Sequence, residues 1–546
     1  MILQKRPPKT LNLAIMKDVL ARDSVTSKDV ERSIRHHVSG TPFGFPQNVD
    51  LIAAYRALTN NKSRRQDLER LLRVKNVRTD SGVAPITVLT KPFPCPGKCV
   101  YCPSEARMPK SYLASEPAAA RALHFKFDPY DQVFKRVQML ETNGHEAKKI
   151  ELIVKGGTWS AYPWSYRQWF IKRCFDAANH LGRKRFARYS TLSASQKANE
   201  SAIYRIIGLT IETRPDWVNA KEIDRLRQLG VTRIELGVQV IDDKILKLIK
   251  RGHTVDHVAD ATALLKSAAF KVDYHFMPGL PGSSPAKDVA MFKKLFSDPR
   301  FCPDMVKIYP CAVLPSAELA AWFKQGKFKP LEGKRLVETI IKMKACVPYY
   351  CRISRVIRDF PSFEVTGGNK ATNLRDMIKL EMKERGLVCK CLRCREAGHR
   401  PTLDPKTELK LFVEKYPNAN GEELLLSYED SKRTTVMSFL RMRLPARTAP
   451  FLLTKGERKG VLESVPSTAL IRELHTYGQA IKINEFDNKT AVQHKGLGKR
   501  LMEEAERIAK KRGYRWMSVI SGIGVRAYYR WLGYRLKGTY MVKRLA

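Results

Sequence analysis

The chain has 546 residues, which is too long for one hydrophobic core and predicts three or four domains. Its formal net charge is +45, from 99 Lys and Arg against 54 Asp and Glu, and so much positive charge implies a polyanionic partner. No apolar stretch has membrane-spanning length and no apolar leader follows Met1, so we expect a soluble, cytoplasmic protein that uses no membrane. Eleven cysteines, most of them in clusters that suit metals, favour a reducing compartment.

Residues 1–77 are expected to form a small basic helical module. Helical apolar spacing recurs over Leu11–Leu20, Val30–His37, Val49–Leu58 and Leu68–Val74. Basic residues gather near the end of the module and suit a phosphate-contacting face, with a solvated helix surface as the alternative. These residues are Lys62, Arg64, Arg65, Arg70, Arg73, Lys75 and Arg78.

From residue 78 to 388 short β-rich runs alternate with amphipathic helical stretches. Six such β/α units fit a parallel sheet curled into a partial barrel. In barrels of this kind ligands bind beyond the C-terminal ends of the strands. The predicted strands are Ile86–Thr90, Ile150–Val154, Ile206–Ile211, Thr232–Val240, Lys271–Phe276 and Met305–Tyr309.

A cysteine triplet, Cys95-Pro-Gly-Lys-Cys99-Val-Tyr-Cys102, follows the first predicted strand. A [4Fe-4S] cluster in all-cysteine ligation normally takes four thiolates, so a triplet leaves one iron for an exogenous amine and carboxylate. The C-x3-C-x2-C spacing is that of the radical S-adenosylmethionine (SAM) enzymes. Half of a structural zinc site is the alternative interpretation.

Other unusual residues fall at the ends of the following strands. Gly156-Gly157 would let backbone carbonyls approach the ammonium group of a ligand closely. Glu212 and Arg214 are candidates for the ribose hydroxyls and the carboxylate of SAM, unless they form an ordinary strand-end ion pair. Residues that close or lie on the last three strands are Gln239, His275, Lys307 and Tyr309.

Residues 389–400 form a cysteine-rich connection that we expect to bind a metal. Cys391 and Cys394 form a C-x2-C knuckle, and two more soft ligands would complete a tetrahedral structural zinc site. Loose reduced thiols are the alternative. The further candidate ligands are Cys311, Cys389 and His399.

Residues 401–546 are predicted to form a second α/β domain. Its strands are expected at Leu424–Tyr428, Thr435–Leu444 and Leu470–His475. A turn, Gln493-His-Lys-Gly496-Leu497-Gly498, then opens a helix over Leu501–Lys511, and the N–H groups of such a turn suit a pyrophosphate. The turn, the strand Met517–Ile520 after the helix and the Tyr528-Tyr529 pair resemble the GCN5-type N-acetyltransferases, whose ligand is acetyl-CoA.

Together the two domains resemble the catalytic subunit of Elongator and its stand-alone, single-chain relatives. The resemblance runs from about Arg78 to Met541. It rests on Val100-Tyr-Cys-Pro103, Glu151-Leu-Ile-Val-Lys-Gly-Gly-Thr158, Gly208-Leu-Thr-Ile-Glu-Thr-Arg-Pro-Asp216, Glu235-Leu-Gly-Val-Gln239, Arg251-Gly-His-Thr254, Arg472-Glu-Leu-His-Thr-Tyr-Gly478 and Tyr528-Tyr-Arg-Trp-Leu-Gly-Tyr-Arg535.

This resemblance implies carboxymethylation at C5 of a wobble uridine in tRNA. The reduced cluster would cleave SAM to a 5′-deoxyadenosyl radical, which would remove hydrogen from the acetyl methyl of acetyl-CoA. The carbon radical would add to C5, and thioester hydrolysis would leave the carboxymethyl group. The basic module and other basic residues would hold the anticodon stem-loop, whose unpaired base must reach the cleft.

By position, the resemblance assigns the cluster to Cys95, Cys99 and Cys102, and catalytic roles to Lys149, Tyr528 and Tyr529. The cysteine group at 389–394 departs here from relatives that keep only the first of its three cysteines. The resemblance is compatible with a homodimer and with Elongator-like partner subunits. Contacts with acetyl-CoA map onto Lys149, Arg472, Glu473, Leu474, His475, Gln493, Gly496, Leu497, Gly498 and Tyr529.

Two other functions fit parts of the same sequence. A protein lysine acetyltransferase with a non-catalytic barrel as scaffold is the first alternative, because the C-terminal domain alone supports that activity. An RNA-binding structural subunit with inert cofactor folds is the second. Formation of deoxyadenosine on adding SAM, reductant, acetyl-CoA and tRNA would separate these alternatives from the carboxymethylation reaction.

Overall fold

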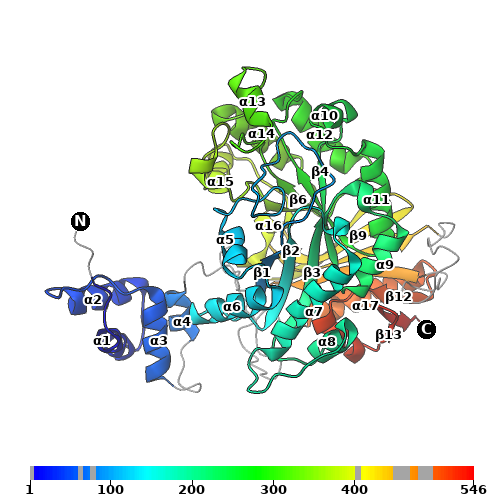
Figure 1. Cartoon of the computed structure of the whole chain (residues 1–546). Coiled ribbons are helices and arrows are strands. Elements are labelled where there is room, and N and C mark those ends of the chain that lie inside the picture. The colour runs from blue at the N-terminus through cyan, green and yellow to red at the C-terminus, as the bar shows by residue number, and fades with distance from the viewer. Residues whose placement is uncertain are drawn as a thin grey trace.

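The computed structural model has three parts: a small helical module, a curled parallel sheet wrapped by helices, and a second sheet (Figure 1). It describes residues 5–59, 66–73, 82–399, 407–446, 468–477 and 496–545. The predicted α/β fold, a partial barrel followed by a second α/β domain, is confirmed. Among the described residues, no helix is both long and apolar enough to cross a membrane.

The N-terminal module is helical where the apolar spacing predicted it. Its second helix starts with a capping box, in which Thr26 and Asp29 satisfy each other's backbone N–H groups. The module adjoins the barrel through Arg56, whose Nη1 donates to the carbonyl of Glu141 at 2.8 Å. Its helices are α1 (Lys9–Leu20), α2 (Ser27–Val38), α3 (Asn48–Leu58) and α4 (Gln66–Leu72).

The barrel sheet has seven parallel strands in sequence order, one more than predicted. The seventh was missed because it is only four residues long and buries one apolar side chain, that of Ile353. The strands are β1 (Val83–Leu89), β2 (Lys149–Lys155), β3 (Arg205–Thr213), β4 (Arg233–Gln239), β5 (Lys271–Phe276), β6 (Met305–Ile308) and β7 (Arg352–Arg355).

Amphipathic helices cover the outer face of the barrel sheet, and their buried side chains build the largest hydrophobic core. These elements are α5 (Pro117–His124), α6 (Pro129–Thr142), η2 (Trp159–Ala161), α7 (Trp164–His180), α8 (Leu192–Asn199), η3 (Pro215–Trp217), α9 (Ala220–Gln228), α10 (Asp243–Leu248), α11 (Val255–Ser267), α12 (Pro285–Ser297), α13 (Leu319–Lys324), α14 (Gly333–Ala345), η4 (Ser362–Glu364), α15 (Leu374–Glu384), α16 (Leu392–Arg395) and η5 (Ala397–His399).

The second sheet has the strand order β13-β14-β12-β11-β10-β9-β8, and it is antiparallel except for the pair β11 and β12. Strands β8, β13 and β14 were not predicted. Its elements are β8 (Leu409–Asn418), β9 (Gly421–Asp430), β10 (Val436–Pro445), β11 (Thr468–Thr476), α17 (Leu497–Lys511), β12 (Trp516–Val519), η7 (Ile523–Val525), α18 (Arg526–Trp531), β13 (Arg535–Lys537) and β14 (Tyr540–Arg544).

The second domain packs against the N-terminal ends of the barrel strands. Asp304, immediately before β6, accepts from Arg472 of β11 at 2.8 Å, and all side-chain atoms of this pair are buried. At another part of the interface, a Cβ on Gly524 would lie 2.6 Å from Cβ of Arg205 at the start of β3. The backbone of the second domain therefore touches the barrel so closely that side chains are excluded from part of the interface.

Removing the carboxylate of Asp304 should weaken this interface. Asp304→Ala would remove one of the two carboxylate partners of Arg472 and the carboxylate beside Lys266, which leaves an excess of buried positive charge, so we expect the free energy of unfolding to fall by about 3 to 5 kcal/mol. Urea denaturation followed by tryptophan fluorescence measures the change. Glu381→Ala, which breaks an exposed pair with Arg385, is the control and should barely move the midpoint. Equal midpoints for the two variants would contradict the assignment.

Candidate functional site

The three cysteines of the triplet lie in the loop after β1, beyond the C-terminal ends of the strands. A Cβ on Gly97 would lie 3.5 Å from Sγ of Cys99 and 3.7 Å from Sγ of Cys95, so this glycine leaves room between the two sulfurs. The backbone N–H of Cys102 donates to the carbonyl of Cys99 at 3.1 Å, which closes a tight turn. Three thiols presented by one short loop fit the donor set expected for a [4Fe-4S] cluster.

Arg251 stabilises the negative form of the central cysteine. Its Nη1 lies 3.4 Å from Sγ of Cys99, and its Nη2 donates to the carbonyl of Gly237 at 2.6 Å. The thiol of Cys102 and then Arg251 lower the pKa of Cys99, against the opposing effect of burial. Thiolates are the form that ligates metals. Arg251 was not predicted as a site residue, although it opens one of the motifs that carry the family resemblance.

Arg214 has one unpaired N–H group next to the cysteine loop. Its Nε and Nη2 both donate to Asp216 at 2.9 Å, whereas its buried Nη1 has no partner among the described residues. A Cβ on Gly97 would lie 2.6 Å from that Nη1. A buried unpaired guanidinium N–H next to the triplet suits an anionic ligand such as the predicted carboxylate of SAM.

The Gly156-Gly157 pair lies at the end of β2, beside the start of the cysteine loop. Gly156 has φ +133, and a Cβ there would collide with Oγ1 of Thr90. Thr90 Oγ1 is 2.8 Å from the hydroxyl of Tyr162. Packing against Thr90 therefore requires glycine at position 156. This requirement is independent of any contact between the carbonyls of the turn and a ligand.

Charged side chains fill the barrel lumen below the cysteine loop. The carboxylate of Glu212 accepts from Tyr112 at 2.9 Å and from Lys155 at 3.1 Å. Although burial alone would raise the pKa of Glu212, the neighbouring side chains of Lys155 and His275 lower it to about 2. Glu212 is therefore an ion-pair partner as well as a candidate for the ribose of SAM.

Glu235 of β4 lies at the centre of this lumen. It pairs with Lys155 and Lys307, and His275 Nε2 lies 3.0 Å from its carboxylate. Burial lowers the pKa of Lys307 to about 8, against the opposing effect of Glu235. Lys155, Glu235 and Tyr112 were not predicted, because their importance depends on partners that are far away in the sequence.

The residues expected to bind acetyl-CoA lie on and beyond β11. The side chain of Arg472 is committed to Asp304 and Glu423, so only its main chain is left for a ligand. Glu473 pairs with Lys271 at 2.9 Å, which ties β11 to the start of β5. The ring of His475 is stacked on Phe439, and its Nε2 is buried without a partner among the described residues.

The predicted phosphate turn leads into α17. Gly496 has φ +65 and would have open space around a Cβ, whereas a Cβ on Gly498 would lie 3.2 Å from the hydroxyl of Tyr528 and 3.6 Å from Oγ1 of Thr476. Leu497 is buried and anchors the first turn. This open, glycine-lined helix N-terminus fits a pyrophosphate. Gln493 lies outside the described residues.

Four other predicted site residues lie in different parts of the fold. Burial raises the pKa of Tyr528 to about 12 and raises the pKa of the buried Tyr529 as well. Lys149 is the first residue of β2. It lies opposite Arg205 of β3 in the register of the sheet, and Arg205 contacts the second domain. Burial lowers the pKa of Lys149. Gln239, at the end of β4, is buried with φ +70.

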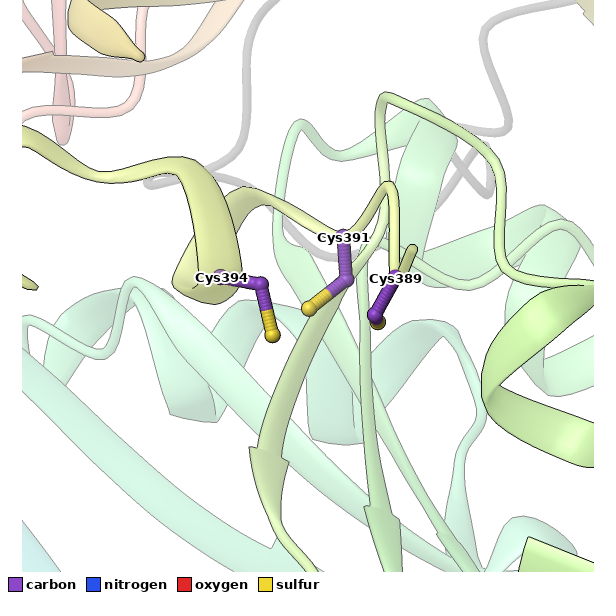
Figure 2. A group of neighbouring side chains, drawn as sticks. All are labelled: Cys389, Cys391 and Cys394. Carbon is purple, nitrogen blue, oxygen red and sulfur yellow. The ribbon is translucent and has the colours of Figure 1, made fainter. Parts of the chain in front are cut away.

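The second cysteine group forms a compact set of thiols. Figure 2 shows Cys389, Cys391 and Cys394 side by side, and their sulfurs all lie within 4.8 Å of one another. The thiols of Cys389 and Cys394 lower the pKa of Cys391. Among the described residues Cys311 does not belong to this group: its backbone N–H bonds Pro278, at the end of β5. The side chain of His399 is not described.

Two family models match the barrel region, and known proteins match most of the chain. Residues 94–295 match the Radical SAM superfamily, and residues 303–384 match the Radical_SAM C-terminal domain. The chain is 45% identical to a tRNA uridine(34) acetyltransferase of Methanocaldococcus infernus, covering 87% of this chain and 88% of the relative. It is 36% identical to Elongator complex protein 3 of Schizosaccharomyces pombe, covering 94% and 93%.

A solved structure agrees with these sequence matches. The archaeal Elp3 of Methanocaldococcus infernus, with its N-terminus (1–46) deleted, matches with a TM-score of 0.73 at 42% identity. The match covers 85% of this chain and 99% of the other chain. The likeness therefore extends through both sheets.

Loss of one thiol of the triplet should prevent cluster assembly. Cys99→Ser removes the thiolate that Arg251 contacts, so we expect no stable [4Fe-4S] absorbance after anaerobic reconstitution. Cys346→Ser, at a half-buried cysteine whose thiol bonds a helix carbonyl, is the control and should assemble a normal cluster. A normal spectrum from the Cys99 variant would refute the ligand assignment.

The second cysteine group should hold one zinc ion per chain. Cys391→Ser removes the central thiol of the group, and elemental analysis of the purified protein should then show that this zinc is lost. The same Cys346→Ser variant should keep its zinc. Zinc retained by the Cys391 variant would mean that these thiols do not bind it.

Proposed function

We propose that this chain is an acyltransferase-type enzyme that modifies the wobble uridine of tRNA. The reason is that it belongs to the radical SAM family of tRNA uridine(34) acetyltransferases and Elongator complex protein 3. More specifically, it forms 5-carboxymethyluridine from SAM and acetyl-CoA. The names of the relatives support the substrate, and the two candidate cofactor sites of this chain support the chemistry.

The polar lumen between the two candidate cofactor sites supports this reaction most directly. Glu212 lies at the C-terminal end of β3, near the cysteine loop, whereas Glu473 contacts the start of β5 from the second domain. Between them run ion pairs of the barrel interior: Glu212 of β3 pairs with Lys155 of β2, and two pairs reach from β2 past β3 to β4, Lys155 with Glu235 and Glu151 with Arg233. A carboxymethyl transfer needs both cofactors in one enzyme, and the polar barrel interior would connect the two candidate sites.

Each cofactor has a set of residues that would hold it. Cys95, Cys99 and Cys102 would ligate the cluster, and Arg214 with the Gly156-Gly157 turn would bind SAM. The open N-terminus of α17 would bind the pyrophosphate of acetyl-CoA. When bound, the cluster and SAM supply one-electron radical chemistry and acetyl-CoA supplies the two-carbon unit.

The protein side chains orient these groups and handle protons. With its pKa raised to about 12, Tyr528 stays protonated at neutral pH and can donate its O–H to a thioester carbonyl. Its hydroxyl lies above Gly498, at the turn that would hold the pyrophosphate. The paired carboxylates of the lumen stay ionised, so they do not supply protons to the reaction.

A protein lysine acetyltransferase is the second candidate, because α17 and Tyr528 would be enough to bind acetyl-CoA without the barrel. That function would not require Arg251 beside Cys99 or the unpaired Nη1 of Arg214. Deoxyadenosine formed from SAM in the presence of reductant, acetyl-CoA and tRNA would exclude a non-catalytic barrel.

The turn before α17 provides a sharp test of the acetyl donor. Gly496→Glu places negative charge where the pyrophosphate should lie, so carboxymethyluridine should disappear while the cluster remains loaded. Mass spectrometry of digested tRNA measures the product, and absorbance measures the cluster.

A second glycine gives a matched control for this variant. Gly386, after α15, has φ +66 against +65 for Gly496, and neither would have a neighbour within 4 Å of a Cβ. Gly386→Glu therefore carries the same backbone strain and the same charge but should leave product formation intact. Normal product from the Gly496 variant would mean that acetyl-CoA binds elsewhere.

A further inference from the structure

The loop between α7 and α8, residues 181–190, carries four exposed cations: Arg183, Lys184, Arg185 and Arg188. The loop contains no acidic residue. Within the described part of the chain, no ion pair joins any of the four to a carboxylate. Their charge is therefore free for an external polyanion, unlike the paired charges of the barrel lumen.

Aromatic contacts fasten this loop to the barrel. The ring of Phe186 stacks on His180 with centroids 4.7 Å apart, and its edge meets Phe134 of α6. His180 Nδ1 accepts from the hydroxyl of Tyr130 at 3.0 Å, and its Nε2–H donates to the carbonyl of Ala187 at 2.7 Å. His180 thus uses both ring nitrogens to hold the loop. The four cations are presented by an ordered turn, which lowers the entropy cost of binding.

The position of the loop excludes contact with the reacting base. Oγ1 of Thr158 is 3.7 Å from Sγ of Cys95, and α7 begins six residues later, at Trp164. The 17 residues of α7 then span about 25 Å before the loop starts. A nucleic acid whose modified base lies at the triplet would meet this loop with a region well away from that base.

The basic helical module adjoins the same helix as the loop. Tyr130 and Phe134, near the start of α6, contact the loop, and Arg56 of α3 bonds Glu141 near the end of α6. Loop and module are therefore joined by one helix, and α6 runs from the module toward the barrel (Figure 1). The loop therefore lies toward one end of α6, and the module contacts the other end.

We propose that residues 181–190 bind the phosphate backbone of the tRNA outside its anticodon loop. This inference rests on the proposed tRNA substrate and adds where a distant part of that substrate is held. Three of the four cations are arginines, whose forked donors match phosphate oxygens in pairs. Such contacts position an RNA without reading its sequence, so they would serve every substrate tRNA equally.

The test compares two RNAs and two charge variants. Loop variant R183A/K184A/R185A/R188A removes the four cations, and control variant K293A/K294A/K379A/K383A removes four exposed lysines from α12 and α15. In Figure 1 these helices lie in the upper part of the molecule, whereas the loop between α7 and α8 lies at the lower edge. Binding of full-length tRNA and of an isolated anticodon stem-loop is measured over a salt series.

For full-length tRNA, we expect the loop variant to lose about 0.7 to 0.9 units of log-log salt slope per phosphate contact, and the control variant to keep the parent slope. The anticodon stem-loop should bind the parent and the loop variant equally well. Charge-preserving R183K/R185K/R188K should retain most of the slope, which separates a charge effect from misfolding.

Three outcomes would overturn the proposal: an unchanged slope in the loop variant, an equal loss in the control variant, or an equal loss with the short RNA. An unchanged slope would leave the loop to another partner, such as an acidic protein. Carboxymethyluridine formed by the parent protein separates this failure from failure of the proposed function. At saturating tRNA the loop variant should form the same product, because none of its four residues lies at the triplet.

Discussion

One buried carboxylate, that of Asp304, determines how the two sheets meet. It accepts from the backbone of Val272 at 2.9 Å and from Arg472 at 2.8 Å, and Lys266 and Arg441 also lie within 4 Å of it. These groups come from the barrel and from β10 and β11, and a buried charge left without partners would be costly. The second sheet is therefore fixed on the N-terminal strand ends, and the opposite ends are left for the cysteine loop.

This docking makes the barrel interior the region between the two candidate cofactor sites, and the side chains of that interior are unusual in being charged. Barrels of parallel strands are commonly filled with branched apolar side chains. Here Lys155, Glu212, Glu235, His275 and Lys307 contact one another, each partly or fully desolvated. Unpaired, any one of them would destabilise the barrel, so the set persists as a mutually neutralising network. Departure from ordinary core packing is typical of functional sites.

The sequence predicted what local patterns encode and missed what depends on long-range partners. Strands β1 to β6, the cysteine loop and α17 follow from apolar periodicity and from residue spacing over short segments. Strand β7 escaped because one buried side chain gives no periodic signal. Cys311 was grouped with Cys389, Cys391 and Cys394 because thiols are soft ligands, yet cysteines nearly eighty positions apart carry no spacing rule. The side chain of Arg472 proved to be an interdomain anchor, since its acidic partners lie in other elements.

The formal charge of +45 therefore combines two populations of cations that act differently. In the lumen and at the interface, Lys155, Arg233 and Arg472 face carboxylates at short distance, and the low-dielectric surroundings shield these pairs from salt. On the surface, residues 181–190 carry cations without acidic partners, and their attraction for a polyanion is screened by salt. Salt should consequently weaken the capture of the RNA while leaving the charges around the cofactor sites in place. If both proposals hold, the residues that would attract the substrate are separate from the residues that would orient the cofactors.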